Sequence, residues 1–231
     1  MGEIEVILEE GWGEFKIDSY PKDRRMIVLE EKEIKGQSSE NIRFLINELV
    51  RRFAKNGVYL EVGTFLGCSL LSAALFNPTT RCIGIDKLNQ FWLVGPISKT
   101  PNKDNNRIFL KENFEKFDLD NVEYYEDDYR EIFKYLFEKE PNLKIDIYFY
   151  DGEHSEEGTL EGYERVLPHL SEKCIILTDD TNWGRPSRAN DAWCREHSDF
   201  RSIVRIPGTP SKSKGKFRIW WNGFEIMVRG F

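Results

Sequence analysis

The chain has 231 residues, of which 40% are hydrophobic, so it can bury one α/β core. Its formal net charge of −7 disfavours non-specific binding to nucleic acid, which needs clustered lysines and arginines. No apolar run approaches the roughly 20 residues that a membrane-spanning helix requires, and the start of the chain lacks the basic and apolar regions of a signal peptide.

Residues 1–37 alternate charged residues with short apolar runs, namely Glu5–Leu8, Phe15–Ile17 and Arg25–Leu29. This pattern predicts small edge strands or an N-terminal extension. The main domain is expected at 38–231 and begins with a helix. Ser38 or Ser39 offers the N-cap of this helix, and apolar residues recur at helical spacing as far as Phe53.

After this helix, short apolar strands alternate with amphipathic helices. The expected strands are Val58–Val62, Arg81–Asp86, Asn121–Tyr125, Ile145–Tyr150 and Cys174–Thr178. The expected helices are Ser69–Leu75, Phe109–Phe117, Tyr129–Lys139 and one with an apolar face of Tyr163, Val166, Leu167 and Leu170. Such alternation predicts an α/β fold with a doubly wound, Rossmann-like and mostly parallel sheet.

Two stretches depart from this alternation. Phe200–Ile206 and Phe217–Trp221 flank a polar loop, which predicts an antiparallel C-terminal hairpin that completes a seven-stranded sheet. Residues 87–106 are long for a connection between a strand and a helix. Long connections are often lids or binding loops, and an idle insertion is the alternative.

The first strand of the main domain runs into the loop Glu61-Val-Gly-Thr-Phe-Leu-Gly67. Its glycines let a ligand approach the backbone, but their spacing fits neither a dinucleotide fingerprint nor a Walker loop. Glu61 would repel phosphates and suits a ligand with an ammonium or sulfonium group. Asp86 could accept hydrogen bonds from ribose hydroxyls, and Asp127 and Asp128 could accept one from an adenine amino group. These residues describe an adenosine with a cationic amino-acid tail.

Acids also follow the fourth and fifth expected strands, at Asp151 and at Asp179 and Asp180. Neighbouring strands lie ~4.8 Å apart, so these carboxylates would converge at the edge that binds the adenosine. A divalent cation with oxygen ligands would relieve their repulsion. Other interpretations stay open: Asp179 or Asp180 caps a turn, Asp151 accepts hydrogen bonds from loop amides, or His154 is a helix N-cap.

In these motifs the chain resembles the class I S-adenosylmethionine-dependent methyltransferases over roughly residues 38–230. Glu61–Gly67 matches their first motif, Asp86 their ribose-binding acid, Asp127 and Asp128 their adenine-side acids, and Asp151–His154 their fourth motif. The resemblance implies S-adenosylmethionine as the cofactor. The implied contact residues are Glu61, Gly63, Thr64, Phe65, Gly67, Ser69, Asp86, Asp127, Asp128 and Asp151.

The Asp-Gly-x-His form of residues 151–154 is similar to that of methyltransferase 24-like enzymes and of metal-dependent O-methyltransferases of sugars and other natural products. This implies Mg²⁺ or another divalent cation on Asp151, Asp179 and Asp180. Asp151 and His154 would be the catalytic residues, with His154 as general base. The acceptor would be a small hydroxylated molecule such as a sugar. Candidates for excluding water, unless they serve ordinary packing, are Phe91, Trp92 and Trp183.

Other functions remain open from the sequence: a metal-independent methyltransferase with another small-molecule acceptor, a non-catalytic S-adenosylmethionine-binding protein, and a nucleic-acid methyltransferase. The net negative charge disfavours the last, although a basic run could attract an anionic acceptor or be a solvated turn: Lys212, Lys214, Lys216 and Arg218. A homo-oligomer is also open. Four scattered cysteines favour a reduced, cytoplasmic protein, with a disulfide pair as the alternative.

Overall fold

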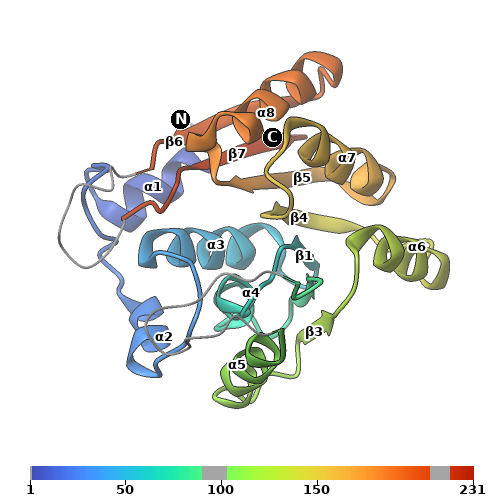
Figure 1. The fold of residues 1–231 in the computed structure, drawn as a ribbon. Coiled ribbons are helices and arrows are strands. Elements are labelled where there is room, and N and C mark those ends of the chain that lie inside the picture. Colours follow the sequence, from blue (N-terminus) through green and yellow to red (C-terminus); the bar gives the residue numbers. More distant parts are fainter. Residues whose placement is uncertain (1, 90–102, 209–218) are drawn as a thin grey trace.

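A seven-stranded sheet forms the centre of the computed structural model, which describes residues 2–89, 103–208 and 219–231 (Figure 1). The strand order is β3-β2-β1-β4-β5-β7-β6. The strands are β1 (Val58–Val62), β2 (Arg81–Ile85), β3 (Val122–Tyr125), β4 (Ile145–Tyr150), β5 (Leu170–Asp179), β6 (Phe200–Ile206) and β7 (Phe224–Arg229). The first five pair in parallel, whereas β7 pairs antiparallel with both β5 and β6. The predicted Rossmann-like sheet with an antiparallel end is confirmed.

Helices cover both faces of the sheet (Figure 1). They are α3 (Glu40–Phe53), α4 (Cys68–Ala74), α5 (Lys103–Glu115), α6 (Tyr129–Lys139), α7 (Glu156–Val166) and α8 (Arg185–Glu196). Alternate residues of β1 feed two separate cores, because successive side chains of a strand point to opposite faces. Tyr59 packs with α3 and α4, whereas Leu60 and Val62 pack with α6, α7 and α8.

The N-terminal segment is helical, so the predicted edge strands are wrong. It contains α1 (Glu5–Trp12), a 3-10 turn at Arg25–Ile27 and α2 (Val28–Glu31). The short apolar runs suggested strands, but the residues that are buried recur at helical spacing: Ile4, Ile7, Leu8 and Trp12. Ion pairs with α3 fix the segment to the main domain, namely Arg24–Glu40, Arg25–Glu48 and Glu30–Arg43.

The second strand of the C-terminal hairpin lies later than predicted, at β7 instead of Phe217–Trp221. Residues 219–222 form a turn, because Trp220 is fully buried and stacks on Trp12 at 5.6 Å between ring centroids. The helix α7 also ends earlier than predicted: Leu167 begins a 3-10 turn, and Leu170 begins β5. Pro168 explains this end, because it lacks the N–H that would continue the helix.

Some predicted features lie outside the described residues, including Phe91, Trp92 and the basic run from Lys212 to Arg218. Residues 103–106, expected in the long connection, belong to α5. Three of the four cysteines are buried free thiols, as expected of packing residues: Cys68, Cys82 and Cys174. Within the described ranges, no helix is both long and apolar enough to cross a membrane.

Candidate active site

Three loops meet at the carboxyl edge of the central strands, and Gly63 lies where they cross. The Gly63 N–H donates to the carbonyl of Ile85 at 2.9 Å, and the Asp151 N–H donates to the carbonyl of Val62 at 2.9 Å. Gly63 has φ +96°, and a Cβ atom on it would collide with the carbonyl oxygen of Asp151. Only glycine therefore lets the loops after β1 and β4 pack this closely.

A cavity of about 290 Å³ opens on one side of Gly63, over the ends of β1 and β2. Its lining mixes apolar groups with acids and includes Val62, Gly63, Ile85, Asp86, Asp127 and Tyr129. Asp86 is buried, and its carboxylate accepts the N–H of Phe65 at 2.7 Å and that of Leu88 at 2.6 Å. Burial raises the pKa of Asp86, and the hydrogen bonds from these two amides partly offset that rise. A carboxylate has about four lone-pair sites, so Asp86 can still accept ligand hydroxyls.

The two predicted adenine-side acids have different surroundings. Asp127 is exposed and lines the 290 Å³ cavity. Asp128 is absent from that lining and caps α6, since its carboxylate accepts the Arg130 N–H at 2.9 Å and lies 2.5 Å from the Lys87 ammonium. Burial alone would raise the pKa of Asp128, but Lys87 and the Arg130 amide outweigh burial and lower it. Of the pair, Asp127 is the acid that a nucleoside can reach.

Glu61 lies beneath the glycine loop and lines neither this cavity nor the neighbouring one. Its carboxylate is 1% exposed and accepts hydrogen bonds from the Tyr59 hydroxyl at 2.6 Å and the Ser69 hydroxyl at 3.1 Å. Burial raises the pKa of Glu61 to about 7, and the hydrogen bonds oppose this rise. Glu61 thus positions Ser69, which does line the neighbouring cavity.

Replacing Glu61 with glutamine should remove a pH-dependent loss of stability. Folding raises the pKa of Glu61 from 4.5 to about 7. The protonated Glu61 carboxyl group therefore contributes fully to the free energy of unfolding below pH 4.5, and this contribution is lost as the pH rises to 7. The rise corresponds to roughly 3 kcal/mol. In urea unfolding without ligands, the wild-type free energy of unfolding should fall by that amount relative to Glu61→Gln across this range. The exposed control Glu115→Gln should follow the wild type, and a constant gap between wild type and Glu61→Gln would contradict the prediction.

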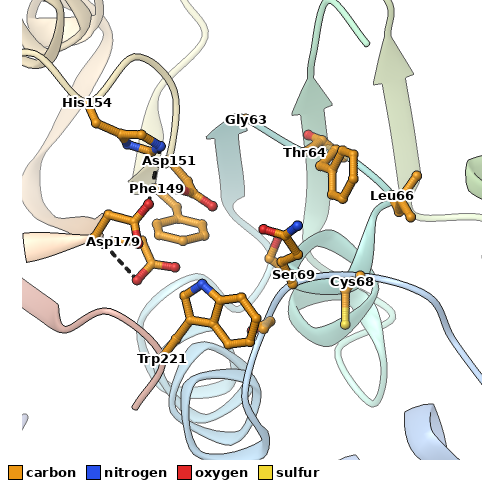
Figure 2. A pocket seen from close by; sticks show the side chains of 15 residues that line it. Gly63, Thr64, Leu66, Cys68, Ser69, Phe149, Asp151, His154, Asp179 and Trp221 are labelled. Carbon is orange, nitrogen blue, oxygen red and sulfur yellow. Dashed lines mark hydrogen bonds and ion pairs between the residues drawn. The ribbon is translucent and has the colours of Figure 1, made fainter. Parts of the chain in front are cut away.

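The second cavity, on the other side of Gly63, has a volume of about 60 Å³ and a mostly polar lining (Figure 2). Asp151, His154 and Asp179 lie on one side of it, while Thr64, Ser69 and Cys68 come from the glycine loop and α4 on the other. Phe149 and Trp221 add aromatic surface. Four predicted cofactor residues, namely Gly63, Thr64, Phe65 and Ser69, therefore share one cavity with the predicted catalytic residues Asp151 and His154, whereas Glu61 and Gly67 are absent from its lining.

Several lining residues of this second cavity were missed from the sequence: Gly36, Gln37, Ser38, Leu66, Cys68, Phe149 and Trp221. Except for Leu66, which lies within the glycine loop, they belong to none of the motifs, and contacts between distant segments bring several of them there. The buried Asn113 amide donates to the carbonyls of Lys35 at 2.7 Å and Leu66 at 2.8 Å, which holds the segment before α3 against the glycine loop. Such contacts leave no local signal in the sequence.

An acidic group with one histidine forms the wall of the second cavity at the ends of β4 and β5. Asp151, His154 and Asp180 each offer a ligand atom, and these atoms lie within 4.8 Å of one another. Asp179 is buried beside them but is not part of this set, and its carboxylate accepts the N–H of Asp180 at 2.8 Å. Among the described residues, no lysine or arginine pairs with Asp151 or Asp179. Burial raises the pKa of Asp151, and the charges of Asp179 and Asp180 raise it further.

Asp180 is held between two partners. The Asn222 side-chain amide donates to its Oδ1 at 2.6 Å, and its Oδ2 lies 3.2 Å from Nε2 of His154. Burial lowers the pKa of His154, which the Asp180 charge only partly offsets, so the ring can accept a proton at neutral pH. His154 is not the N-cap of α7, because the Ser155 hydroxyl takes that role by accepting the Gly158 N–H at 3.0 Å.

Comparisons with known proteins agree with this geometry. A family model described as a methyltransferase domain, of the methyltransferase 24 type, matches residues 60–181. The fold is similar to the O-methyltransferase TomG from Streptomyces achromogenes, solved with S-adenosylmethionine (TM-score 0.62, 16% identity, 99% of both chains). It is also similar to an O-methyltransferase from Bacillus cereus (TM-score 0.60, 17% identity, 98% of this chain and 99% of that one). No curated protein matches the sequence.

Proposed function

Since the chain belongs to the class I S-adenosylmethionine-dependent methyltransferases of the methyltransferase 24 type, we propose that it methylates a hydroxyl of a small molecule with the help of a divalent cation. One observation carries the proposal: the cluster of Asp151, His154 and Asp180 lines the same cavity as Gly63 of the glycine loop and Ser69 of α4. Figure 2 shows Asp151 and His154 across this cavity from Ser69. A proton acceptor and acidic metal ligands would then adjoin the methyl donor.

The residues at the edge of the sheet suit S-adenosylmethionine. The 290 Å³ cavity offers Asp86 for the ribose and Asp127 for the base, beside the apolar side chains of Val62 and Ile85. Gly63 lines both this cavity and the second one, so a ligand can extend from one to the other past a residue without a side chain. The surplus of carboxylates in the second cavity favours the cationic half of the molecule there.

The acidic cluster suits a divalent cation. Carboxylates that lie this close repel one another. Burial is the largest cause of the raised pKa values of Asp151 and Asp179, and the charges of the neighbouring acids raise them further. Asp151 and Asp180 would hold the ion, with the buried Asp179 adding charge beside them. Mg²⁺ matches an oxygen-rich set, whereas a ligating imidazole would favour a transition metal. When bound, the cation lowers the pKa of a substrate hydroxyl.

The side chains then act on the acceptor in a simple order. His154 takes the proton of the acceptor hydroxyl, and Asp180 stabilises the resulting imidazolium through the 3.2 Å contact. The acceptor oxygen forms a bond to the methyl carbon as the carbon–sulfur bond breaks, and the electron pair of that bond stays on sulfur. The opposite charges of oxygen and sulfonium disappear, so the apolar rings of Phe149 and Trp221 assist by excluding water.

Metal removal tests the proposal directly. We expect exhaustive chelation to abolish methyl transfer to a panel of sugars and phenols, and added Mg²⁺ or Mn²⁺ to restore it. Mn²⁺ binding, followed by electron paramagnetic resonance, should be lost in Asp180→Asn and kept in the surface control Asp191→Asn. Full activity after chelation would refute the metal, and cofactor binding without transfer to any acceptor would refute catalysis.

The contact between His154 and Asp180 supports a second candidate, a metal-independent methyltransferase. A neutral imidazole that a carboxylate orients is a general base without any ion. In that case chelation would leave turnover unchanged, and Asp180→Asn would still reduce it because the imidazolium would lose its stabilising charge.

A further inference from the structure

A third cavity, of about 390 Å³, adjoins the second cavity across His154. Its lining residues are Glu153, His154, Ser155, Trp183 and Arg185. His154 is the only described residue that lines both the second and the third cavity. A molecule bound in the third cavity would therefore contact His154, the proposed base, directly.

Trp183 gives this third cavity an aromatic wall. Its residue surface is 56% exposed, which is unusual for an indole, and its ring lies 4.6 Å from the His154 ring at 80° between planes. Trp183 closes the short 3-10 turn Thr181–Trp183 that follows Asp180, so it is fixed to the acidic cluster by the chain itself. An exposed ring held beside a proposed base suits stacking with a planar acceptor.

Arg185 gives the third cavity a cation. It is exposed, and no carboxylate of the described residues pairs with it, whereas Arg188 one turn later pairs with Glu156 at 2.8 Å. A guanidinium presents a planar set of donors that matches a carboxylate with two parallel hydrogen bonds. Glu153 is the opposing charge in the lining, and its carboxylate accepts a hydrogen bond from the Ser155 hydroxyl at 2.7 Å.

We propose that this third cavity is the outer part of the acceptor site and that it binds a hydroxylated aromatic carboxylate, an inference that rests on the proposed function. The acceptor hydroxyl lies at His154, its ring lies on Trp183, and its carboxylate pairs with Arg185. The charges favour this orientation, because the described lining of the second cavity contains no lysine or arginine, whereas Arg185 lines the third cavity and attracts the carboxylate there.

Two matched probes test the assignment: 3,4-dihydroxybenzoate, and 3,4-dihydroxybenzamide, which has the same hydroxyls without the charge. Isothermal titration calorimetry should show about fivefold tighter binding of the benzoate, as expected for one partly exposed ion pair. In Arg185→Gln, benzoate binding should fall to the benzamide level while benzamide binding stays unchanged. Arg195→Gln is the matched control, because Arg195 is also exposed on α8, has no carboxylate partner among the described residues and lies outside the cavity lining. It should behave as wild type.

Trp183→Ala should weaken both probes by a similar factor, about fivefold or more, because stacking does not depend on the carboxylate. The exposure of this ring means that the variant should keep its fold. In turnover, Arg185→Gln should raise KM for the benzoate and leave kcat within about twofold of the wild type.

The proposal is overturned if wild type binds both probes equally, if Arg185→Gln weakens both, or if neither binds. Tighter binding of the cationic 3,4-dihydroxybenzylamine would also overturn it and would assign the cavity to Glu153. Failure of the proposed function would be seen separately. In that case the wild-type protein would not bind S-adenosylmethionine, or its methyl transfer would be insensitive to chelation, while the Arg185-dependent difference between the two probes would persist.

Discussion

Replacing Asp151 with asparagine should abolish methyl transfer and, at the same time, make the ligand-free protein more stable. Asp151 is common to several parts of the site: it lines the second cavity, belongs to the cluster with His154 and Asp180, and provides the backbone against which Gly63 packs. Loss of a metal ligand beside the proposed base should reduce kcat/KM by about 10³-fold or more.

The stability gain in Asp151→Asn has a separate cause. Burial and the charges of Asp179 and Asp180 disfavour the ionised Asp151 carboxylate, as its raised pKa shows. An amide of the same shape removes that repulsion at neutral pH, and we expect a gain on the order of 1–2 kcal/mol in the free energy of unfolding. In a chain of this length each kcal/mol raises the melting temperature by roughly 2–4 °C.

Asp151→Asn should therefore lose methyl-transfer activity while the free energy of unfolding of the ligand-free protein rises. That combination is the diagnostic result. Asp191→Asn provides the control, because Asp191 is half-exposed and pairs with Arg205 at 2.8 Å, away from the cavity. It should leave turnover unchanged and should not raise the melting temperature. A variant of Asp151 that unfolds more readily than wild type, or that keeps more than about a tenth of wild-type turnover, would contradict the assignment.

The fold and the positions of the acids were predictable because they depend on local patterns. Buried parallel strands read as short apolar runs, and their carboxyl ends meet at one edge of the sheet. Asp86, Asp151 and Asp179 each end or follow such a run, so their convergence follows from strand order alone. The matching family model, over residues 60–181, covers this same part of the chain.

What each acid contacts was not predictable, because a single hydrogen bond decides it. Asp127 and Asp128 are equivalent in the sequence, yet Asp128 caps α6 and Asp127 faces the cavity. Glu61 belongs to the cofactor motif, yet it lies below the loop, where its carboxylate accepts a hydrogen bond from the Ser69 hydroxyl. Such distinctions depend on the direction of individual side chains, which neither spacing nor hydropathy encodes.

The remaining wall of the site depends on contacts between distant segments. Trp221 lines the second cavity, and the Asn222 side chain donates a hydrogen bond to Asp180. Both follow Trp220, which is buried against Trp12, more than 200 residues away in sequence. The helical N-terminal segment that provides Trp12 was predicted as strands or an extension. The predicted edge strands were wrong, and that prediction concealed the residues whose positions depend on α1.

Gly63→Ala should disrupt the protein far more than an alanine at another glycine of similar backbone conformation. Gly63 (φ +96°) and Gly184 (φ +78°) both adopt backbone angles that cost a residue with a Cβ about 1–2 kcal/mol. At Gly184 the nearest atom to an added Cβ is Nη1 of Arg188 at 3.5 Å, which is an ordinary contact. At Gly63 the added atom meets the backbone carbonyl of Asp151, which a rotamer change cannot move.

The difference between the two alanine variants therefore isolates the packing of the loops after β1 and β4. We expect Gly63→Ala to cost roughly 3–5 kcal/mol in the free energy of unfolding, against about 1–2 kcal/mol for Gly184→Ala. Calorimetric titration of S-adenosylmethionine should show lost binding only in Gly63→Ala, since separating these loops moves both Asp151 and the glycine loop. Equal stability costs in the two variants, or intact cofactor binding in Gly63→Ala, would mean that the close approach of the loops is not what forms the site.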